Sequence, residues 1–455
     1  MIKRTLEEIR IMVNGEINND TDEDTTIHGV SIDTRTLKEG QLYIPIIGEK
    51  FNGHDFIRDA IEQGAYAALW SESYIPDVNI PLIIVKDSVA AIQSLAKHYR
   101  EQLTVKVIGI TGTNGKTSTK DILGSILSTK YKTFKTKGNL NNHLGVPLTL
   151  LSLESDTEMA VVEMGMSDLG EIEVLTKIAS PDVAVITNIG SGHLEVLKTK
   201  ENVANAKLEI IKGLKLDGLF IYNGDDQLLE KKASKITNLH EIKTFGQRDN
   251  NDFQFRVISN TNGITFKINK LDSFFLPMLG VHQAYNATAS IAVANHFNIP
   301  LDFIKKGLTN IQLTSMRNEI IKAVNFDILN DAYNCNPEST KAAINTIYSL
   351  TGYKQKIIVF ADMLELGENE IELHKEIGRQ INFNEVDYLF TYGELAKYTA
   401  YEAKKKSSKE NVFSFNTKAE LILLLQQILK KDGIILLKGS RGMKLEDIAN
   451  ALLKK

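Results

Sequence analysis

The sequence is poor in cysteine and has no long apolar run. Cys335 is the single cysteine among 455 residues, which excludes an intramolecular disulfide, so we expect a reducing, cytoplasmic environment. No segment approaches the roughly 18 consecutive apolar residues of a membrane helix, and we therefore expect no contact with a membrane. Residues 1–9 carry charges of both signs and no apolar core, which predicts a first helix and not a signal peptide.

The sequence also lacks a large charge of either sign. Its formal net charge is -4, so non-specific binding to nucleic acid is not favoured, and we expect no nucleic-acid partner. Hydrophobic residues at 43% and charged residues at 24% are typical of a globular protein. At roughly 100–200 residues per domain the chain is too long for one core. We predict three domains, at residues 1–100, 101–315 and 316–455.

Apolar segments and helical patterns alternate along the chain. The first hundred residues hold short β-rich segments and helical patterns near 56–63 and 88–102, which predicts a small α/β domain. Apolar strands at 105–110, 159–163, 182–187 and 218–222 alternate with helices, which predicts a parallel sheet covered on both faces. Residues 253–257 and 264–268 alternate strictly around Thr261-Asn262-Gly263, which predicts an antiparallel hairpin added to that sheet.

The last part of the chain repeats the α/β alternation. Strands at 326–330, 356–360, 387–390 and 433–437 alternate with helices near 337–350, 370–380 and 418–429. This order predicts a doubly wound, Rossmann-like domain. The predicted fold class is therefore α/β, with a central P-loop domain built on a parallel sheet between a small N-terminal α/β domain and this C-terminal domain.

A glycine-rich loop follows the strand at 105–110 and precedes a helix from about residue 117. Glycines let the backbone approach a polyphosphate, backbone amides and the helix N-terminus face the anion, and the lysine reaches the outer phosphates. The hydroxyl after the lysine can bind Mg²⁺. Ile110 stands where the full Walker spacing has its first glycine, which indicates a particular branch of P-loop enzymes. The predicted ATP-binding residues here are Gly112, Thr113, Asn114, Gly115, Lys116, Thr117 and Ser118.

Polar residues also follow other predicted strands. Glu163 ends one strand and could hold Mg²⁺, and His193 follows the strand at 185–190. Open α/β sheets bind ligands at these strand ends. Lys207 alone is typical of a solvated helix lysine. Residues 330–337, a dense polar cluster, and 438–442, a possible anion-binding turn, follow strands of the third domain.

Several motifs in this order resemble those of the Mur ligase family, ATP-dependent enzymes that extend the peptide of the peptidoglycan precursor. They are the glycine-rich loop, Glu163-Met164-Gly165, Asn188-Ile189-Gly190 with His193, and Gly280-x-His282-x-x-x-Asn286-Ala287. Residues 31–35, 136–147, 331–337, 362–367 and 438–442 are similar to segments of the branch that adds D-alanyl-D-alanine. The resemblance covers about residues 28–447. This sequence departs from it at Cys335 for alanine, Ala361 for glycine and His143 for glutamate.

The resemblance implies roles for single residues. It implies two Mg²⁺ ions, one at Thr117 and Glu163 and a second at His193 and a carbamylated Lys207. It implies that His282 and Asn286 lie on the adenine side of ATP and that Arg317 and Asp331 close over the nucleotide. It implies that the uridine diphosphate substrate contacts Ser31, Arg35, Asn141 and Asn142. The implied catalytic residues are Lys116, Lys207 and His193.

The implied reaction is the ATP-dependent ligation of D-Ala-D-Ala to UDP-MurNAc-tripeptide through an acyl phosphate, by a monomer. Three alternatives stay open. The preceding ligase of the family shares the loop and the metal positions, but it has a histidine-containing version of residues 331–334. Folylpolyglutamate synthase has its P-loop close to the N-terminus. A regulatory protein with a degenerate ligase fold would lose Lys116, Glu163 or His193. The third residue of the tripeptide, lysine or diaminopimelate, is also left open.

Overall fold

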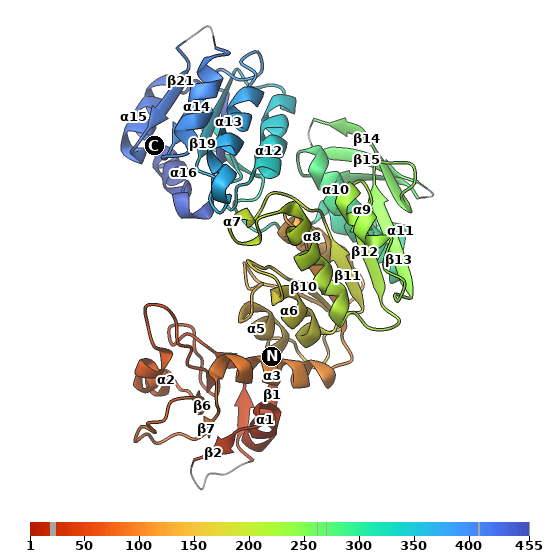
Figure 1. Ribbon diagram of the computed structural model, residues 1–455, viewed down its shortest axis with the longest axis vertical. Helices are drawn as coiled ribbons and strands as arrows, with labels where there is room; N and C mark the ends of the chain where they lie inside the picture. Colours follow the sequence, from red (N-terminus) through yellow and green to blue (C-terminus); the bar gives the residue numbers. More distant parts are fainter. Residues whose placement is uncertain (19–23, 262, 270, 408–409, 455) are drawn as a thin grey trace.

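The computed structural model describes residues 1–18, 24–261, 263–269, 271–407 and 410–454. Over these residues the chain forms three α/β units, which follow one another along the molecule from the N-terminal end to the C-terminal end (Figure 1). The observed fold is therefore the predicted three-domain α/β fold. No helix among the described residues is long and apolar enough to cross a membrane.

The first unit is a small sheet with helices around it. Over the described residues, five strands follow the order β2-β7-β6-β5-β4, in which only β2 is antiparallel to its neighbour, and β1 pairs separately with β3. The strands are β1 (Lys3–Thr5), β2 (Glu16–Ile17), β3 (Thr26–His28), β4 (Val30–Ser31), β5 (Leu42–Tyr43), β6 (Ala67–Trp70) and β7 (Leu82–Ile84). The helices are α1 (Leu6–Val13), α2 (Ile57–Glu62) and α3 (Ser88–Glu101).

The first helix begins later than predicted. Lys3–Thr5 is a strand, and α1 starts at Leu6 because Thr5 caps it. The Glu8 amide donates to Thr5 Oγ1 at 3.2 Å, and the Thr5 amide donates to Glu8 Oε2 at 2.8 Å. This reciprocal capping box is visible in the sequence as Thr-x-x-Glu, so the residues contained the signal for the correct start.

Helix α3 joins the first unit to the second. It packs on α1 on one side and on α5 (Gly145–Leu151) and α6 (Glu171–Ala179) on the other. The Tyr99 hydroxyl donates to the Leu153 carbonyl at 2.8 Å, and Arg100 Nε donates to the Ala179 carbonyl at 3.0 Å. One apolar cluster accordingly runs without a break from α1 through α3 to one face of the central sheet.

The central unit is built on a mostly parallel sheet. Within the described ranges, its nine strands follow the order β16-β15-β14-β13-β12-β11-β8-β10-β9, and only β14, β15 and β16 pair antiparallel. The predicted hairpin is thus confirmed as β14 and β15, and Asn262 of its turn lies outside the described residues. The strands are β8 (Lys106–Thr111), β9 (Thr133–Lys135), β10 (Met159–Glu163), β11 (Val183–Ile186), β12 (Leu219–Asn223), β13 (Glu241–Gly246), β14 (Phe253–Asn260), β15 (Ile264–Ile268) and β16 (Ser273–Leu276).

Helices cover both faces of the central sheet, as predicted. One face carries α4 (Lys116–Leu127), α10 (Val281–His296) and α11 (Leu301–Thr309). The other carries α5, α6, α8 (Lys200–Leu208) and α9 (Gln227–Ala233), and the short α7 (Leu194–Leu197) lies toward the third unit (Figure 1). The strands β8, β10 and β11 are buried along nearly all of their length, which is why they appear in the sequence as continuous apolar runs.

The third unit repeats this design on a smaller scale. In its described part, six strands follow the order β17-β18-β22-β19-β20-β21, and all except β17 are parallel. They are β17 (Glu319–Lys322), β18 (Phe326–Asn330), β19 (Gln355–Ala361), β20 (Tyr388–Tyr392), β21 (Val412–Phe415) and β22 (Gly433–Lys438). One face packs on α12 (Pro337–Ser349), α13 (Glu370–Gln380) and α14 (Ala396–Lys404), the other on α15 (Lys418–Ile428) and α16 (Glu446–Leu453). A sheet with helices on both faces is the doubly wound arrangement that the sequence predicts.

Candidate active site

The glycine-rich loop connects β8, which ends at Thr111, to α4, which begins at Lys116. Gly115 caps the helix with a positive φ of 82°, a conformation that favours glycine. A Cβ at Gly115 would lie 2.4 Å from Asn286 Oδ1, and one at Gly112 would lie 1.9 Å from Thr187 Oγ1. Glycine is therefore required at both positions by the packing of the loop against α10 and against the end of β11.

Lys116 lies inside this loop. Its Nζ donates to the carbonyls of Gly112 at 2.8 Å and Thr113 at 3.1 Å. Burial lowers the pKa of Lys116 to about 8, against the opposing effect of the Glu163 carboxylate. The ammonium is thus held at the N-terminus of α4, next to backbone amides that favour an anion.

Three buried oxygens near this loop form no hydrogen bond with the described residues. They are Thr111 Oγ1, Thr117 Oγ1 and Glu163 Oε2, and each residue is at most 1% exposed. The other Glu163 oxygen accepts from Asn141 Nδ2 at 2.8 Å. A buried polar atom without a hydrogen bond is costly, so the pair Thr117 and Glu163 needs a reason. A hydroxyl and a carboxylate oxygen are the donors that Mg²⁺ prefers, and these two residues therefore fit the implied ion.

Lys120 is a buried cation that was not predicted from the sequence. It lies one turn after Lys116 on α4, is 1% exposed, and has its Nζ 3.8 Å from Glu163 Oε2 and 3.6 Å from Asp121 Oδ1. The spacing of four residues from Lys116 was the available signal, because residues i and i+4 share one face of a helix. Lys120 brings a second positive charge close to Glu163.

Lys207 is buried on α8, contrary to the solvated lysine that its surroundings in the sequence suggest. It is 1% exposed, and its side chain forms no hydrogen bond or ion pair with the described residues. Burial, with a smaller contribution from Lys116, lowers the pKa of Lys207 well below its usual value. A buried amine without a counter-ion favours its neutral form, which is the form that reacts with carbon dioxide.

His193 faces the third unit. It lies just before α7 with a φ of 59°, and its Nδ1 is 2.8 Å from Glu365 Oε2. The hydrogen bond with His193 lowers the pKa of Glu365. Over the described residues, no group of three or more His, Cys, Asp or Glu side chains could hold a metal ion. A second ion at His193 and Lys207 therefore stays a prediction.

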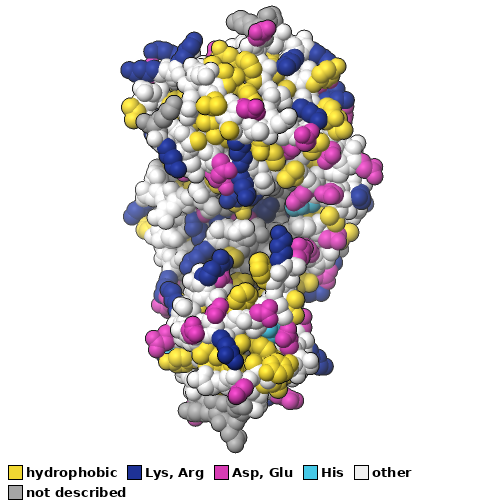
Figure 2. Space-filling view, turned by 90° about the vertical axis from the view of Figure 1, so that its left-hand side faces the viewer, with side chains coloured by type: hydrophobic (Ala, Val, Ile, Leu, Met, Phe, Trp, Pro, Cys, Tyr) yellow, Lys and Arg dark blue, Asp and Glu magenta, His cyan; other side chains and the backbone are white. Residues whose placement is uncertain are grey.

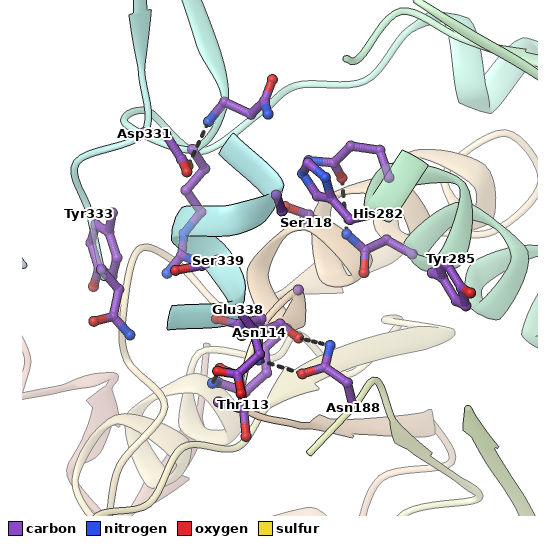
Figure 3. Close-up of a pocket in the computed structure, with 18 of the residues that line it drawn as sticks. Thr113, Asn114, Ser118, Asn188, His282, Tyr285, Asp331, Tyr333, Glu338 and Ser339 are labelled. Carbon is purple, nitrogen blue, oxygen red and sulfur yellow. Dashed lines mark hydrogen bonds between the residues drawn. The ribbon is translucent and has the colours of Figure 1, made fainter. Parts of the chain in front are cut away.

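A cavity lies where the carboxyl ends of β8, β11 and β12 meet those of β18 and β22 (Figure 3). It brings together most of the predicted nucleotide ligands, from the loop, from α10 and from the third unit. Figure 2 shows a recess across the middle of the molecule with Lys and Arg side chains around it, which suits an anionic ligand. The predicted site residues that line the cavity are Thr113, Asn114, Gly115, Lys116, Ser118, His282, Asn286, Arg317 and Asp331.

Helix α10 supplies the polar wall of this cavity. Asn286 Nδ2 donates to Gln283 Oε1 at 3.0 Å, and Gln283 Nε2 is 3.2 Å from His282 Nε2. Burial lowers the pKa of His282, so this ring favours the neutral state. Tyr285 projects from the same helix (Figure 3). Its hydroxyl donates to Asp225 at 2.7 Å.

The third unit supplies the opposite wall. The Arg317 guanidinium lies 4.1 Å from the centre of the Tyr333 ring, and its buried Nε has no hydrogen-bond partner among the described residues. Asp331 accepts from the Asn318 amide at 3.1 Å and pairs with Lys438 at 2.9 Å. Lys438 also donates to the Asn334 carbonyl at 2.6 Å, so this lysine holds the loop after β18 in place.

Side chains also join the two units directly. Asn336 Nδ2 donates to Asn114 Oδ1 at 2.8 Å, and Asn114 Nδ2 donates back to Asn336 Oδ1 at 3.2 Å. Glu338 accepts from the Ser191 hydroxyl and from Lys200, each at 2.8 Å. Asn336 and Glu338 begin α12, so this helix is fixed to the glycine-rich loop and to the loop after β11. These contacts were not among the predictions from the sequence.

The predicted uridine-diphosphate ligands divide into two places, and none lines the cavity. Ser31 and Arg35 belong to the first unit, where Ser31 Oγ donates to the Asp33 carbonyl at 2.9 Å and the exposed Arg35 pairs with the Asp33 carboxylate at 2.7 Å. Asn141 contacts Glu163, and Asn142 Oδ1 accepts from the Gly145 amide at 2.9 Å at the start of α5. Gly112, Thr117, His193 and Lys207 also lie outside the cavity lining.

Family models match each unit of the chain. The Mur ligase family catalytic domain matches residues 26–100, the Mur ligase middle domain residues 110–294, and the Mur ligase glutamate ligase domain residues 316–441. The UDP-N-acetylmuramoyl-tripeptide–D-alanyl-D-alanine ligase of Bacillus subtilis (strain 168) is 46% identical, and the alignment covers 100% of this chain and 99% of that protein. The chain belongs to the Mur ligase family.

Solved Mur ligase structures share the whole fold. Crystal structure I of MurF from Acinetobacter baumannii superposes with a TM-score of 0.89 at 31% identity, covering 100% of both chains. The MurF ligase of Thermotoga maritima in complex with ADP has a TM-score of 0.82 at 28% identity, covering 94% of this chain and 97% of that one. Among Mur ligases, the relative and both structures favour the MurF branch over the preceding ligase and over folylpolyglutamate synthase.

Proposed function

We propose that this chain is an ATP-dependent ligase that joins D-alanyl-D-alanine to UDP-N-acetylmuramoyl-tripeptide during synthesis of the peptidoglycan precursor. The observation that carries the proposal is the glycine-rich loop, whose lysine and neighbouring unpaired oxygens lie beside a cavity bounded by two units. The names of the relatives supply the two substrates. The likeness to MurF from Thermotoga maritima, solved with ADP, supports the nucleotide.

ATP binds, in this proposal, with its phosphates on the loop and its base toward α10. The residues from Gly112 to Ser118 surround the phosphates, and Lys116 balances their charge. His282 and Asn286 lie on the adenine side, and Arg317 and Asp331 approach from the third unit. The support is that Thr113–Lys116, both α10 residues, Arg317 and Asp331 line one cavity.

Thr117 and Glu163 would hold one Mg²⁺, and His193 and a carbamylated Lys207 would hold a second. Bound Mg²⁺ neutralises negative charge on phosphate oxygens during phosphoryl transfer. Support for the first ion is the pair of buried oxygens without hydrogen bonds among the described residues. Support for the carbamate is that Lys207 is buried and has no counter-ion in the described part of the chain.

The reaction has two steps. The terminal carboxylate of the tripeptide attacks the γ-phosphorus, which gives an acyl phosphate and ADP. The amine of D-Ala-D-Ala then attacks the acyl carbon, and phosphate leaves through a tetrahedral intermediate. Lys116 stabilises charge on the transferring phosphoryl oxygens, the kind of electrostatic contribution that is usually largest in such catalysis. Contacts between the second and third units keep water from the acyl phosphate.

The uridine diphosphate end of the substrate belongs to the first unit in this proposal, at Ser31 and Arg35. Asn141 and Asn142 then face the muramyl peptide, and Asn141 also orients Glu163 through its hydrogen bond. We further propose that the enzyme acts as a monomer in the cytoplasm, which light scattering on the purified protein and fractionation of cells would test.

The decisive experiment measures phosphate release with ATP, a UDP-MurNAc-peptide and D-Ala-D-Ala, each omitted in turn. We expect release only when all three are present, and comparison of the lysine and diaminopimelate tripeptides identifies the third residue. Release that requires a single amino acid and rejects the dipeptide would contradict the proposed function. Lys116→Ala serves as the background control.

A further inference from the structure

One contact joins the predicted catalytic His193 to the third unit. His193 Nδ1 lies 2.8 Å from Glu365 Oε2, and His193 Nε2 forms no hydrogen bond with the described residues. The backbones touch as well, because the Glu195 amide donates to the Glu365 carbonyl at 3.2 Å. A Cβ at Gly367 would lie 3.1 Å from Glu195 Cα, so the two loops pack closely.

Both residues of this pair have an unusual backbone. The φ of His193 is 59° and that of Glu365 is 63°, in the left-handed region that side chains other than glycine rarely adopt. Such conformations are strained and persist where the surrounding structure holds them, often at functional sites. Two of them face each other here, across the boundary between two units.

The loop that carries Glu365 is held firmly within the third unit. Before it, the Asp362 carboxylate accepts from the backbone amides of Glu394, Leu395 and Ala396 at 3.1, 3.0 and 2.7 Å. The next amides along the loop also have partners, since that of Met363 donates to His374 Nε2 at 3.0 Å and that of Leu364 donates to Ser440 Oγ at 2.9 Å. The backbone that carries Glu365 is therefore held within the third unit.

We propose that Glu365 is a positioning residue that acts through His193. Its carboxylate lies within hydrogen-bonding distance of Nδ1, so it favours the tautomer with the proton on Nδ1 and a lone pair on Nε2 and holds the ring in one orientation. A carboxylate behind an imidazole commonly sets tautomer and basicity in this way. The carboxylate belongs to the third unit, so the packing of the third unit on the second completes the surroundings of His193.

This inference rests on the proposed function for its kinetic consequence but not for its structural one. The matched variants are Glu365→Ala, which removes the acceptor, and Glu365→Gln, which keeps an acceptor oxygen on the same backbone. Glu368→Ala is the control, because Glu368 is exposed in the same loop and its side chain contacts no charged group among the described residues. Thermal unfolding of all three verifies that they fold.

The kinetic test is phosphate release with all substrates. We expect Glu365→Ala to lower kcat roughly 10- to 100-fold, the usual cost of losing a partner that orients a ligand histidine. The KM for ATP should change less than about twofold, since the contact does not touch the nucleotide cavity. Glu365→Gln should recover most of kcat, and Glu368→Ala should match the parent. A Glu365→Ala enzyme with parental kcat, or a Glu365→Gln enzyme as slow as it, would overturn the proposal.

The structural test needs no turnover. Imidazole ¹⁵N spectra of the histidine-labelled protein, with the His193 signal assigned through His193→Gln, should show the Nδ1–H tautomer in the parent and in Glu365→Gln. In Glu365→Ala the signal should move to the other tautomer or to a mixture. An unchanged signal in Glu365→Ala would refute the positioning role even if kcat falls. If the parent releases no phosphate, the proposed function fails while the spectra still report on Glu365.

Discussion

The second and third units both present polar side chains at the carboxyl ends of parallel strands, but the two edges differ in how those side chains are paired. At the edge of the third unit, the Asp362 carboxylate accepts from three backbone amides, and Lys438 is bound by Asp331 and by two backbone carbonyls. At the edge of the second unit, Glu163 has an oxygen and Lys207 an amine without hydrogen bonds among the described residues.

This difference indicates two different roles for similar folds, namely ligand binding and rigid docking. Side chains already saturated with hydrogen bonds have little capacity left for a ligand, and they make the edge of the third unit rigid. Buried polar atoms without hydrogen bonds carry a desolvation cost that a bound ion or phosphate would offset. The chemistry is therefore expected on the second unit, and the third unit is expected to act by docking. The third unit also has buried atoms without hydrogen bonds among the described residues, including Arg317 Nε, Asn318 Oδ1 and Asn330 Oδ1, so the contrast concerns Asp362 and Lys438 and not the whole edge.

The largest expected effect comes from removing the lysine of the glycine-rich loop. Lys116→Ala should lower the rate of ADP formation by about 10³-fold or more, because one well-placed donor to the developing charge is worth about 10²–10³ and this one is a full cation. A coupled ADP assay measures it. Lys177→Ala, an exposed lysine in a surface ion pair, is the control. Near-parental turnover by Lys116→Ala would break the assignment of chemistry to the second unit.

The next effect concerns the buried amine. Loss of a residue that merely orients a metal ligand costs about 10- to 100-fold, so Lys207→Ala should cost about 100-fold or more if its carbamate binds Mg²⁺. Lys207→Arg should be equally impaired, because a guanidinium keeps the charge but does not form the carbamate. A ¹³C signal of the carbamate in ¹³C-bicarbonate buffer is the direct measurement. If neither the addition of bicarbonate nor the Lys207→Ala substitution changes the activity, this amine has no such role.

A smaller effect should appear with pH. The pKa of Lys116 is lowered to about 8, so the lysine is charged below that pH and loses its proton above it. Phosphates bind the charged form, so ADP affinity should be constant below pH 8 and fall by up to about tenfold per unit above it, with proton uptake on binding. Calorimetry in two buffers of different ionisation enthalpy measures the uptake. The dependence should vanish in Lys116→Ala, and its persistence there would assign it to another group.

The smallest expected effect concerns the contact between α12 of the third unit and the glycine-rich loop. Asn336→Ala removes the cap of α12 and the paired amides that hold Asn114. Loss of such a cap costs about 1 kcal/mol of unfolding free energy, which chemical denaturation can measure. Thr417→Ala, a cap on α15 away from the second unit, is the matched control. If Asn336→Ala raises the KM for ATP and Thr417→Ala does not, α12 supports the glycine-rich loop. Equal behaviour of the two variants would show that it does not.

Buried elements could be predicted closely from the sequence, and edge elements could not. The strands at 159–163 and 326–330 agree with β10 and β18 residue for residue, because buried parallel strands appear as continuous apolar runs. The strands β9 and β13 were missed, since they are half-exposed and contain charged residues that interrupt the pattern. The predicted start of α1 was wrong because the prediction did not use the capping box at Thr5.

In the candidate site too, some features could be predicted from the sequence and others could not. Local motifs sufficed to indicate the glycine-rich loop and Glu163, because strand, loop and helix follow one another in the chain. The pairing of Asn114 with Asn336 joins residues 222 positions apart, and the contact of His193 with Glu365 likewise crosses between units. Such contacts depend on how two finished domains pack, and no local pattern encodes that.

The position of α3 has a practical consequence for dissecting the enzyme. A fragment starting after this helix would expose the faces of α5 and α6 that α3 covers, and a fragment ending with it would expose the opposite face. Either piece would leave a broad apolar surface in water and tend to aggregate. Isolated production of the second unit should therefore retain Ser88–Glu101, and the first unit is best studied within the whole chain.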